Sequence, residues 1–287
     1  NTFDWLLTET KKDHRVRMVH VNRLPPHVNG KKYAITLGIK AAKYEWLLFT
    51  DADCRPAGMD WIKSMSNGFS ADSKFVLGYS PYLKGKGLLN HFIRFEALIS
   101  GIQYLSFAVL GNPYMGVGRN LSYRRSLFLE AKGFNDTISI TGGDDDLFVN
   151  RHANGGNTTV CIGGASLIYS IPQTTWSSFF TQKIRHLSVG KFYRFRHRAL
   201  LGIFSVSWLV TWFAGFFLLC TTYGLYGVLG ALLTRLLVFS LLVNKASEKL
   251  GQPFPVWAVL PLDFIYAFYY LVTGLVALVS KKVRWKN

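Results

Sequence analysis

The stretch Glu45–Cys54 reads EWLLFTDADC and joins an apolar segment directly to two carboxylates that are one residue apart. Its first six residues, Glu45–Thr50, have the composition of a buried strand. Asp51 and Asp53 then fall at the carboxyl end of that strand. A plain structural interpretation is an Asx-type turn, because Asp side chains readily bond nearby backbone amides. The rest of the sequence favours a second interpretation, in which the two acids carry chemistry.

The segments before this strand predict a parallel sheet. Arg15–Asn22 alternates with the period of a half-exposed strand, and Lys31–Lys43 has apolar residues at helical spacing. A strand, a helix and the strand Glu45–Thr50 in this order form a β-α-β unit, which implies parallel strands. Ligands of open parallel sheets bind beyond the carboxyl ends of the strands. Asp51 and Asp53 therefore lie where such a sheet presents its site.

The DxD pair suits a hard divalent cation. Mg²⁺ typically takes one or two protein carboxylates together with water and substrate phosphates, so the pair predicts a metal-bound diphosphate. A phosphatase scaffold also places a DxD pair at a strand end, where the first Asp attacks phosphate. That scaffold continues with Gly and then Thr or Val, whereas this chain continues with Cys54-Arg55-Pro56. The phosphatase is the runner-up interpretation of this motif.

The last third of the 287-residue chain is strongly apolar. Leu200–Cys220 has no charged residue, Thr221–Val243 has only Arg235, and Pro253–Ser280 has only Asp263. Each segment reaches the roughly 20 residues that a bilayer core requires. Three buried helices of a soluble protein are the alternative, but such helices normally keep a polar face. Charged residues at membrane depth usually find partners, so Arg235 and Asp263 are predicted to pair.

The rest of the chain carries most of the charge. Residues 1–199 hold 26 of the 33 basic and 14 of the 16 acidic residues, which predicts a soluble, basic domain. Six basic residues crowd the approach to the first apolar segment: Lys183, Arg185, Lys191, Arg194, Arg196 and Arg198. This is the positive-inside pattern of a cytoplasmic membrane surface, so no nucleic acid is expected as a partner. The three cysteines lack metal-ligand spacing and fit a reducing compartment.

A second acidic motif is GGDDD, residues 142–146. Three adjacent carboxylates repel one another, and this repulsion raises the pKa of at least one of them unless a metal or a basic residue intervenes. A carboxylate with a raised pKa is a candidate general base. The motif also predicts a helix start, with Gly-Gly as a turn and acids in the first helical turn. Both interpretations hold together, because a helix N-terminus at a sheet edge can present a reactive carboxylate.

The motif QKIRH follows two predicted strands, Thr158–Ile162 and Ser166–Ile171. Gln182, Arg185 and His186 share one face of a helix by their i, i+3, i+4 spacing. They present an amide, a planar cation and an imidazole together. Taken alone, the segment is equally typical of a solvated basic helix face.

In this order, the DxD pair, the acid pair after glycine, the Gln-x-x-Arg motif and the apolar segments resemble the family 2 glycosyltransferases of the GT-A fold. These enzymes include the cellulose and hyaluronan synthases and many bacterial lipid-linked sugar transferases. The resemblance covers nearly the whole chain. Its segments are Gly30–Ala34, Asp51–Pro56, Gly116–Asn120, Asp144–Asp145 and Gln182–His186.

The resemblance implies an α/β fold, with a GT-A catalytic domain and its mostly parallel, Rossmann-like sheet over residues 1–198. Two or three transmembrane or interfacial helices are expected over residues 199–287. The implied reaction is an inverting transfer of a hexose from a nucleoside diphosphate sugar, most commonly a UDP-sugar, to a lipid-linked or polysaccharide acceptor. Mg²⁺ or Mn²⁺ is the implied cofactor. The protein is then a multi-pass protein of the inner, cytoplasmic membrane, with membrane lipids as partners and its catalytic domain in the cytoplasm.

The matching motifs imply the roles of the site residues. Asp145 is the implied base, because it stands six residues before Arg151, as the family's base stands before a helical Arg. Asp51 is expected to face the nucleotide and Asp53 the metal, with Lys31 also on the donor side. The expected acceptor or diphosphate contacts are Arg119, Asp144, Gln182, Arg185 and His186.

The chain departs from the family pattern at two places. The family's first strand and its early aspartate, which hold uracil and ribose, have no counterpart, so the chain is expected to be an N-terminally truncated fragment that lacks part of its nucleotide site. His186 replaces the Trp of the family's QxxRW motif. That aromatic lies near the acceptor in the synthases, so its replacement predicts a non-processive transfer of one sugar.

Two other functional classes stay open. A catalytically silent membrane subunit of a polysaccharide-assembly system would share the fold but would not need Asp145, Asp53 and Arg185 together. A small-molecule transporter would need polar groups along its membrane segments, which carry only two charges.

The basic C-terminus constrains the membrane topology. With the catalytic domain inside, three full spans would place that terminus outside, against the positive-inside bias. One of the last two segments is therefore expected to be interfacial or re-entrant. Thr221–Val243 is the expected one, because Arg235 lies at its centre.

Overall fold

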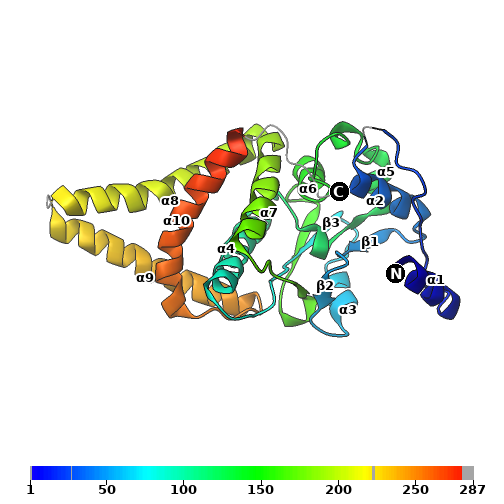
Figure 1. Cartoon of the computed structure of the whole chain (residues 1–287), viewed down its shortest axis with the longest axis horizontal. Helices are drawn as coiled ribbons and strands as arrows, with labels where there is room; N and C mark the ends of the chain where they lie inside the picture. The colour runs from blue at the N-terminus through cyan, green and yellow to red at the C-terminus, as the bar shows by residue number, and fades with distance from the viewer. Residues whose placement is uncertain (1, 27, 222–223, 280–287) are drawn as a thin grey trace.

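The computed structural model describes residues 2–26, 28–221 and 224–279. The helices are α1 (Thr2–Lys12), α2 (Gly30–Ala41), α3 (Trp61–Ser66), α4 (Leu88–Val109), α5 (Arg125–Glu130), α6 (Asp146–His152), α7 (Trp176–Val189), α8 (Phe195–Thr221), α9 (Leu225–Lys249) and α10 (Val256–Val279). The strands are β1 (Trp46–Phe49), β2 (Cys54–Pro56), β3 (Phe75–Gly78), β4 (Leu121–Arg124), β5 (Thr158–Cys161) and β6 (Ile168–Ser170). Figure 1 shows the sheet and its covering helices on one side of the molecule and α8, α9 and α10 on the other.

The central sheet has four strands in the order β1-β4-β3-β5. β1 and β3 each pair antiparallel with β4, and β3 pairs parallel with β5. Three strands therefore run in one direction and β4 runs against them, so the predicted α/β class is confirmed and the sheet is mixed. Phe75, Val76 and Leu77 in the central strand β3 are fully buried, as expected for a strand that is covered on both faces.

The strand predicted over Arg15–Asn22 is wrong. The segment forms no strand, and β1 is left as an edge strand in the part of the chain that the structure describes. A strand needs a neighbour that pairs with its backbone N–H and C=O groups. Alternating side chains alone do not supply that neighbour. The observed unit is therefore α2 followed by β1, without the first strand of a β-α-β unit.

The strands predicted over Thr158–Ile162 and Ser166–Ile171 are present as β5 and β6, but they lie in different sheets. β5 pairs with β3, whereas β6 pairs antiparallel with β2, directly after the DxD pair. In that small sheet Cys54 lies opposite Ser170. The β2–β6 ribbon therefore anchors the C-terminal end of the turn that carries the two aspartates.

Helix α4 belongs to the core of the part that contains the central sheet. It is long and apolar enough to cross a membrane by length and composition, yet 67% of its apolar window is buried inside the protein. It packs against β5, α9 and α10. Its buried residues include Phe92, Phe95 and Leu98. Because α4 is covered by protein on most sides, its apolar composition reflects its place in the core.

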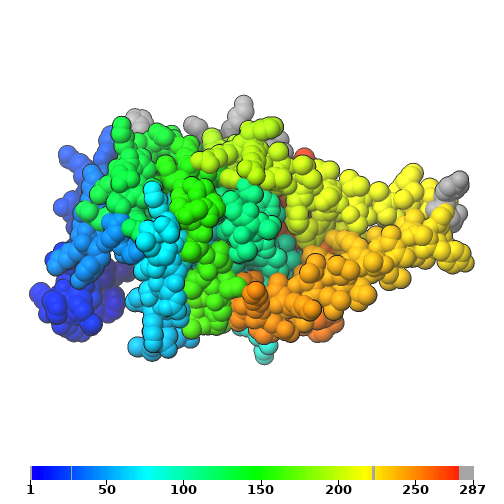
Figure 2. All heavy atoms as spheres, turned by 180° about the vertical axis from the view of Figure 1, so that it is seen from behind, coloured from blue at the N-terminus to red at the C-terminus, as the bar shows by residue number. Residues whose placement is uncertain are grey.

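The three predicted apolar segments are confirmed as the long helices α8, α9 and α10, and each is apolar enough to cross a membrane. In Figure 1, α8 and α9 form a hairpin that extends away from the part that contains the sheet, and α10 runs across it, next to α7. From behind, the hairpin is a narrow arm (Figure 2). The predicted boundary at residue 198 falls inside α8, which begins at Phe195. The division into two domains stays a prediction.

The predicted pairing of the two charges in the apolar segments is confirmed. The Arg235 guanidinium on α9 forms an ion pair with the fully buried carboxylate of Asp263 on α10. The indole N–H of Trp212 on α8 donates to the same carboxylate at 3.0 Å. One carboxylate therefore joins three helices.

Candidate active site

The DxD turn leaves its carboxylates available for partners. The turn after β1 is closed by the backbone, where the Cys54 N–H donates to the Asp51 carbonyl at 3.1 Å. Asp51 is half-buried and Asp53 is exposed. One carboxylate oxygen of each and the Cys54 sulfur lie within 4.8 Å of one another. A backbone-closed turn does not need these side chains for its own geometry, so the plain turn does not account for both acids.

Lys31 joins the two acidic motifs. It lies in the first turn of α2, where the Asn29 side chain accepts from the Lys32 N–H at 3.2 Å and caps the helix. The Lys31 Nζ lies 2.9 Å from Asp144 Oδ2 and 3.4 Å from Asp51 Oδ1. Burial alone would lower the pKa of Lys31, but the nearby carboxylates of Asp144, Asp145 and Asp51 raise it above its ordinary value. The ammonium is therefore firmly charged.

The GGDDD motif starts helix α6, as the sequence predicts. Gly142 and Gly143 have φ values of +81° and +73°, which favour glycine in the preceding turn. Asp145 is the N-cap residue. Its two carboxylate oxygens accept from the Gly118 N–H at 2.6 Å and from the Asp146 N–H at 2.8 Å. Burial first, and then repulsion from Asp144, raise the pKa of Asp145 above its ordinary value.

Asp146 has a structural environment that differs from that of Asp145. Its carboxylate accepts from the Tyr193 hydroxyl at 2.7 Å and from the Leu147 N–H at 2.8 Å. Burial and the neighbouring Asp145 raise the pKa of Asp146 to about 8. The side chain thus ties the start of α6 to the segment that leads into α8.

Helix α7 carries the predicted Gln182, Arg185 and His186. The Gln182 side-chain oxygen is buried and has no hydrogen-bond partner among the described residues. Burial lowers the pKa of Arg185, while the carboxylates of Asp144 and Asp51 act in the opposite direction. His186 is exposed. The three residues therefore lie on one helix, as the sequence predicts.

Arg119, which the sequence predicts as an acceptor or diphosphate contact, forms several hydrogen bonds within the protein. Its guanidinium donates to the Ser80 hydroxyl at 2.8 Å, to the Ser80 carbonyl at 3.2 Å and to the Tyr82 hydroxyl at 3.3 Å. It also lies over the Tyr82 ring, 4.8 Å from the centroid. These bonds hold the segment after β3 beside the site, so Arg119 acts at least partly as a structural residue.

Sequence analysis does not identify two buried residues that shape the site. Lys32 is fully buried, and its ammonium donates to the carbonyls of Thr137 at 2.5 Å and Ile140 at 3.0 Å. Burial lowers its pKa to about 8. The other residue is Tyr193, the partner of Asp146. For Lys32, the sequence does offer a signal, because it follows Lys31 directly. Consecutive residues of a helix point in different directions, so the two lysines are expected to have different roles.

The donor set fits a hard divalent cation. Cys54 is an unsuitable ligand, since its sulfur lies 3.2 Å from the Ser170 hydroxyl and burial raises the pKa of the thiol. Asp51 and Asp53 then remain as two carboxylates, one of them exposed. Mg²⁺ and Mn²⁺ prefer carboxylate oxygens and readily complete their shells with phosphate oxygens. The residues present therefore match a cation that is bound together with a phosphorylated ligand.

Comparison with known proteins places these features in context. The family described as "Glycosyl transferase family group 2" matches residues 46–277, about four fifths of the chain. Among solved structures, a mannosyltransferase from Pyrobaculum calidifontis in complex with GDP-Man and Mn²⁺ is similar, with a TM-score of 0.55 and 14% identity. The similarity covers 98% of this chain and 75% of that one. No curated protein matches the chain.

Proposed function

The chain belongs to glycosyl transferase family group 2, and from this premise we propose that it moves one hexose from a nucleoside diphosphate sugar to an acceptor at a membrane surface, with inversion. The observation that carries the proposal is the position of Lys31 between Asp51 and Asp144. It brings the DxD pair and the acid run into one cluster. A donor-side motif and a candidate base then face the same space, as a single displacement requires.

Asp53 is proposed to hold the divalent cation of the donor complex, and Asp51 is proposed to face the nucleotide beside it. When bound there, Mg²⁺ or Mn²⁺ supplies positive charge to the departing diphosphate. Lys31 keeps Asp51 in place through its ion pair. Its own positive charge adds to the field at the diphosphate, so the donor site combines two carboxylates with a fixed ammonium.

Asp145 is proposed as the general base that removes the proton of the acceptor hydroxyl. A base works best when its pKa approaches the working pH, and burial and Asp144 raise the pKa of Asp145 in that direction. The two backbone bonds from Gly118 and Asp146 fix the carboxylate orientation. Asp144 is the partner of Lys31, and this leaves Asp145 as the acid of the run that is available to an acceptor.

The residues of α7 are proposed to contact the diphosphate or the acceptor. Arg185 lies near Asp144 and Asp51, and a guanidinium suits two phosphate oxygens at once. The buried, unpartnered oxygen of Gln182 is suited to accept from a hydroxyl of the bound sugar or acceptor. His186 is exposed at the same helix and is proposed on the acceptor side, together with the part of Arg119 that Ser80 and Tyr82 leave accessible.

A UDP-sugar is the proposed donor and a lipid-linked or glycan molecule the proposed acceptor, at the cytoplasmic face of the membrane. The similar mannosyltransferase holds GDP-Man, so GDP-sugars are the competing donors to test. The membrane-surface acceptor is supported by the packing of α7 on the apolar helix α10. The basic residues beside α8 support the cytoplasmic placement.

Donor turnover by the full-length protein in detergent or membranes tests the proposal. UDP- and GDP-hexoses are supplied with Mg²⁺, with Mn²⁺ or with a chelator, and release of the nucleoside diphosphate is measured. We expect turnover of at least one donor that stops on chelation and is absent from Asp145→Asn. A folded protein that neither binds nor turns over any of these donors would favour the catalytically silent subunit instead.

A further inference from the structure

Helices α8 and α9 lack the polar face of a surface helix. Only 11% of the apolar window of α8 and 6% of that of α9 are buried inside the protein. On α8, Val210, Phe213 and Phe217 are exposed, and so are Ile203 and Val206 nearer the start of the helix. Uncovered apolar side chains along two whole helices form a far larger patch than a soluble protein exposes. The hairpin is therefore suited to lipid.

Helix α10 differs from the hairpin, because one of its faces is fixed to the catalytic part. Tyr269 contacts Phe92 on α4 and Phe179 on α7, with ring centroids 5.2 Å and 5.9 Å apart. Tyr266 contacts Phe95 with centroids 5.9 Å apart. The opposite face of α10 is a partly exposed apolar stripe at helical spacing: Trp257, Leu260, Phe264, Phe268, Val272 and Leu275. In this stripe, Phe264 and Phe268 also contact α8. The helix thus has a protein side and a lipid side.

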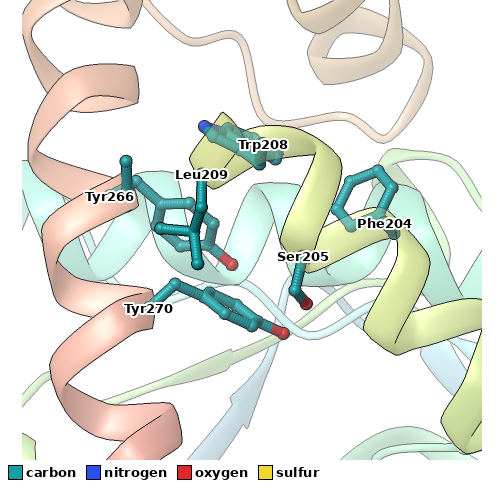
Figure 3. Close-up of a pocket in the computed structure, with 7 residues that line it drawn as sticks. Phe204, Ser205, Trp208, Leu209, Tyr266 and Tyr270 are labelled. Atoms are coloured by element: carbon teal, nitrogen blue, oxygen red, sulfur yellow. The ribbon is translucent and has the colours of Figure 1, made fainter. Parts of the chain in front are cut away.

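The hairpin and α10 are joined at about the middle of the hairpin. Trp212 of α8 and Arg235 of α9 both contact Asp263 of α10. Nearby, Ser205 and Trp208 of α8 pack against Tyr266 and Tyr270, as Figure 3 shows. The cavity between them measures only about 10 Å³, so this junction is filled by side chains. α10 is therefore held across the hairpin and cannot swing into line with it without breaking the ion pair.

Charge and length set the direction of insertion. Apart from Arg235 at the junction, the basic residues of the described hairpin and its approach lie at the end next to the catalytic part: Lys191, Arg194, Arg196, Arg198, Lys245 and Lys249. No charged residue occurs among residues 213–221 and 225–234, which form the outer half. Beyond Trp212, α8 continues for about 14 Å at 1.5 Å per residue. This is about half of the roughly 30 Å hydrocarbon core.

We propose that α8 and α9 cross the bilayer as a hairpin that enters from the catalytic side and returns to it. α10 lies across this hairpin in the nearer leaflet and does not cross. The occupant of the exposed apolar faces is thus lipid, and the basic end of the hairpin lies at anionic headgroups. The re-entrant segment expected from the sequence, Thr221–Val243, is replaced in this proposal by α10. The catalytic site and both ends of the hairpin then lie on one side.

Cysteine labelling in intact cells tests this arrangement. In a full chain with Cys54, Cys161 and Cys220 replaced by Ala, single cysteines are placed by Tyr226→Cys at the hairpin tip and Lys245→Cys at its return end. Asn287→Cys reports on the C-terminus, which lies outside the described residues. An impermeant maleimide is applied to intact and to permeabilised cells. Resistance of each variant to alkaline extraction from membranes serves as the insertion control.

We expect Tyr226→Cys to react in intact cells, and Lys245→Cys and Asn287→Cys to react only after permeabilisation. Labelling of Asn287→Cys in intact cells would show that α10 crosses, and it would overturn the proposal. A Tyr226→Cys variant that stays unlabelled in intact cells would overturn it as well, because the tip would then not reach the far side. The labelling pattern does not depend on catalysis, so its outcome is separate from that of the proposed transfer reaction.

Discussion

Two regions of the molecule place a cation beside carboxylates, and they differ in balance. Around Lys31 lie Asp51, Asp144 and Asp145, with Asp53 exposed at the edge. Between the apolar helices, Arg235 meets the single carboxylate of Asp263, which also accepts from Trp212. The first region has more acids than cations, also when Lys32 and Arg185 are counted beside Lys31. The second has one of each.

This difference distinguishes a ligand-binding site, around Lys31, from a structural ion pair, Arg235–Asp263. A buried pair with its hydrogen bonds satisfied needs nothing further, and its net contribution to stability can be small. An acidic excess costs free energy unless a cation arrives. At Asp145, burial first and then repulsion from Asp144 raise the pKa. We infer that the unbalanced cluster is built for a metal-bound ligand and that the balanced pair fixes the position of a helix.

The largest effect that distinguishes the two regions is expected from Asp145→Asn in the acid cluster. The amide keeps the volume of the side chain but cannot accept the acceptor proton, so turnover is expected to fall by about 100-fold or more. Donor affinity should stay close to that of the wild type. Initial rates and a donor-binding titration measure the two quantities. If Asp145→Asn keeps full turnover while Asp144→Asn loses it, the assignment of the base is off by one residue.

The second prediction concerns the Arg235–Asp263 ion pair. Arg235→Leu leaves Asp263 buried without its cation and is expected to lower stability by about 3 kcal/mol. The matched variant Arg235→Leu/Asp263→Leu removes both charges and should recover most of that loss. Thermal unfolding in detergent measures stability, and turnover per folded molecule should stay unchanged in both. Loss of turnover in the folded double variant would contradict a purely structural role.

A smaller change in rate is expected from Asp144→Asn, which tests the electrostatic role of Asp144 in the acid cluster. Asp144 raises the pKa of Asp145 by repulsion, and it also occupies Lys31. Removing its charge should lower the pKa of Asp145. A base is active when deprotonated, so the acidic limb of the rate profile should move to lower pH, with a rate change of about tenfold or less at neutral pH. A limb that moves to higher pH would contradict this electrostatic role.

The sequence predicts the local elements of the fold better than their pairing. The strand before Asp51, the helix start at Asp145 and the face of α7 follow from periodicity and from turn residues. The antiparallel insertion of β4 and the ribbon of β2 with β6 depend on contacts between distant segments, which no local pattern encodes. The false strand at Arg15–Asn22 has the same cause, because its pattern fits but its neighbour is absent from the described structure.

The candidate site shows the same limit. The DxD pair and the acid run are visible as motifs, whereas their union through Lys31 is a property of the tertiary fold. The partners of Lys32 and of Asp146 lie far away in sequence and have no motif of their own. The Arg235–Asp263 pair is the exception. Its prediction succeeds because charges at membrane depth have very few possible partners.

The central claim is that the acidic excess around Lys31 holds a metal-bound nucleoside diphosphate, and Mn²⁺ binding tests it most directly. Free Mn²⁺ is followed by electron paramagnetic resonance in the presence of UDP or GDP, with the full-length protein, Asp53→Ala and Arg235→Leu/Asp263→Leu. We predict that wild type and the double variant bind Mn²⁺ equally and that Asp53→Ala binds it at least about tenfold more weakly, because it loses a carboxylate ligand. Equal binding by wild type and Asp53→Ala would contradict the account.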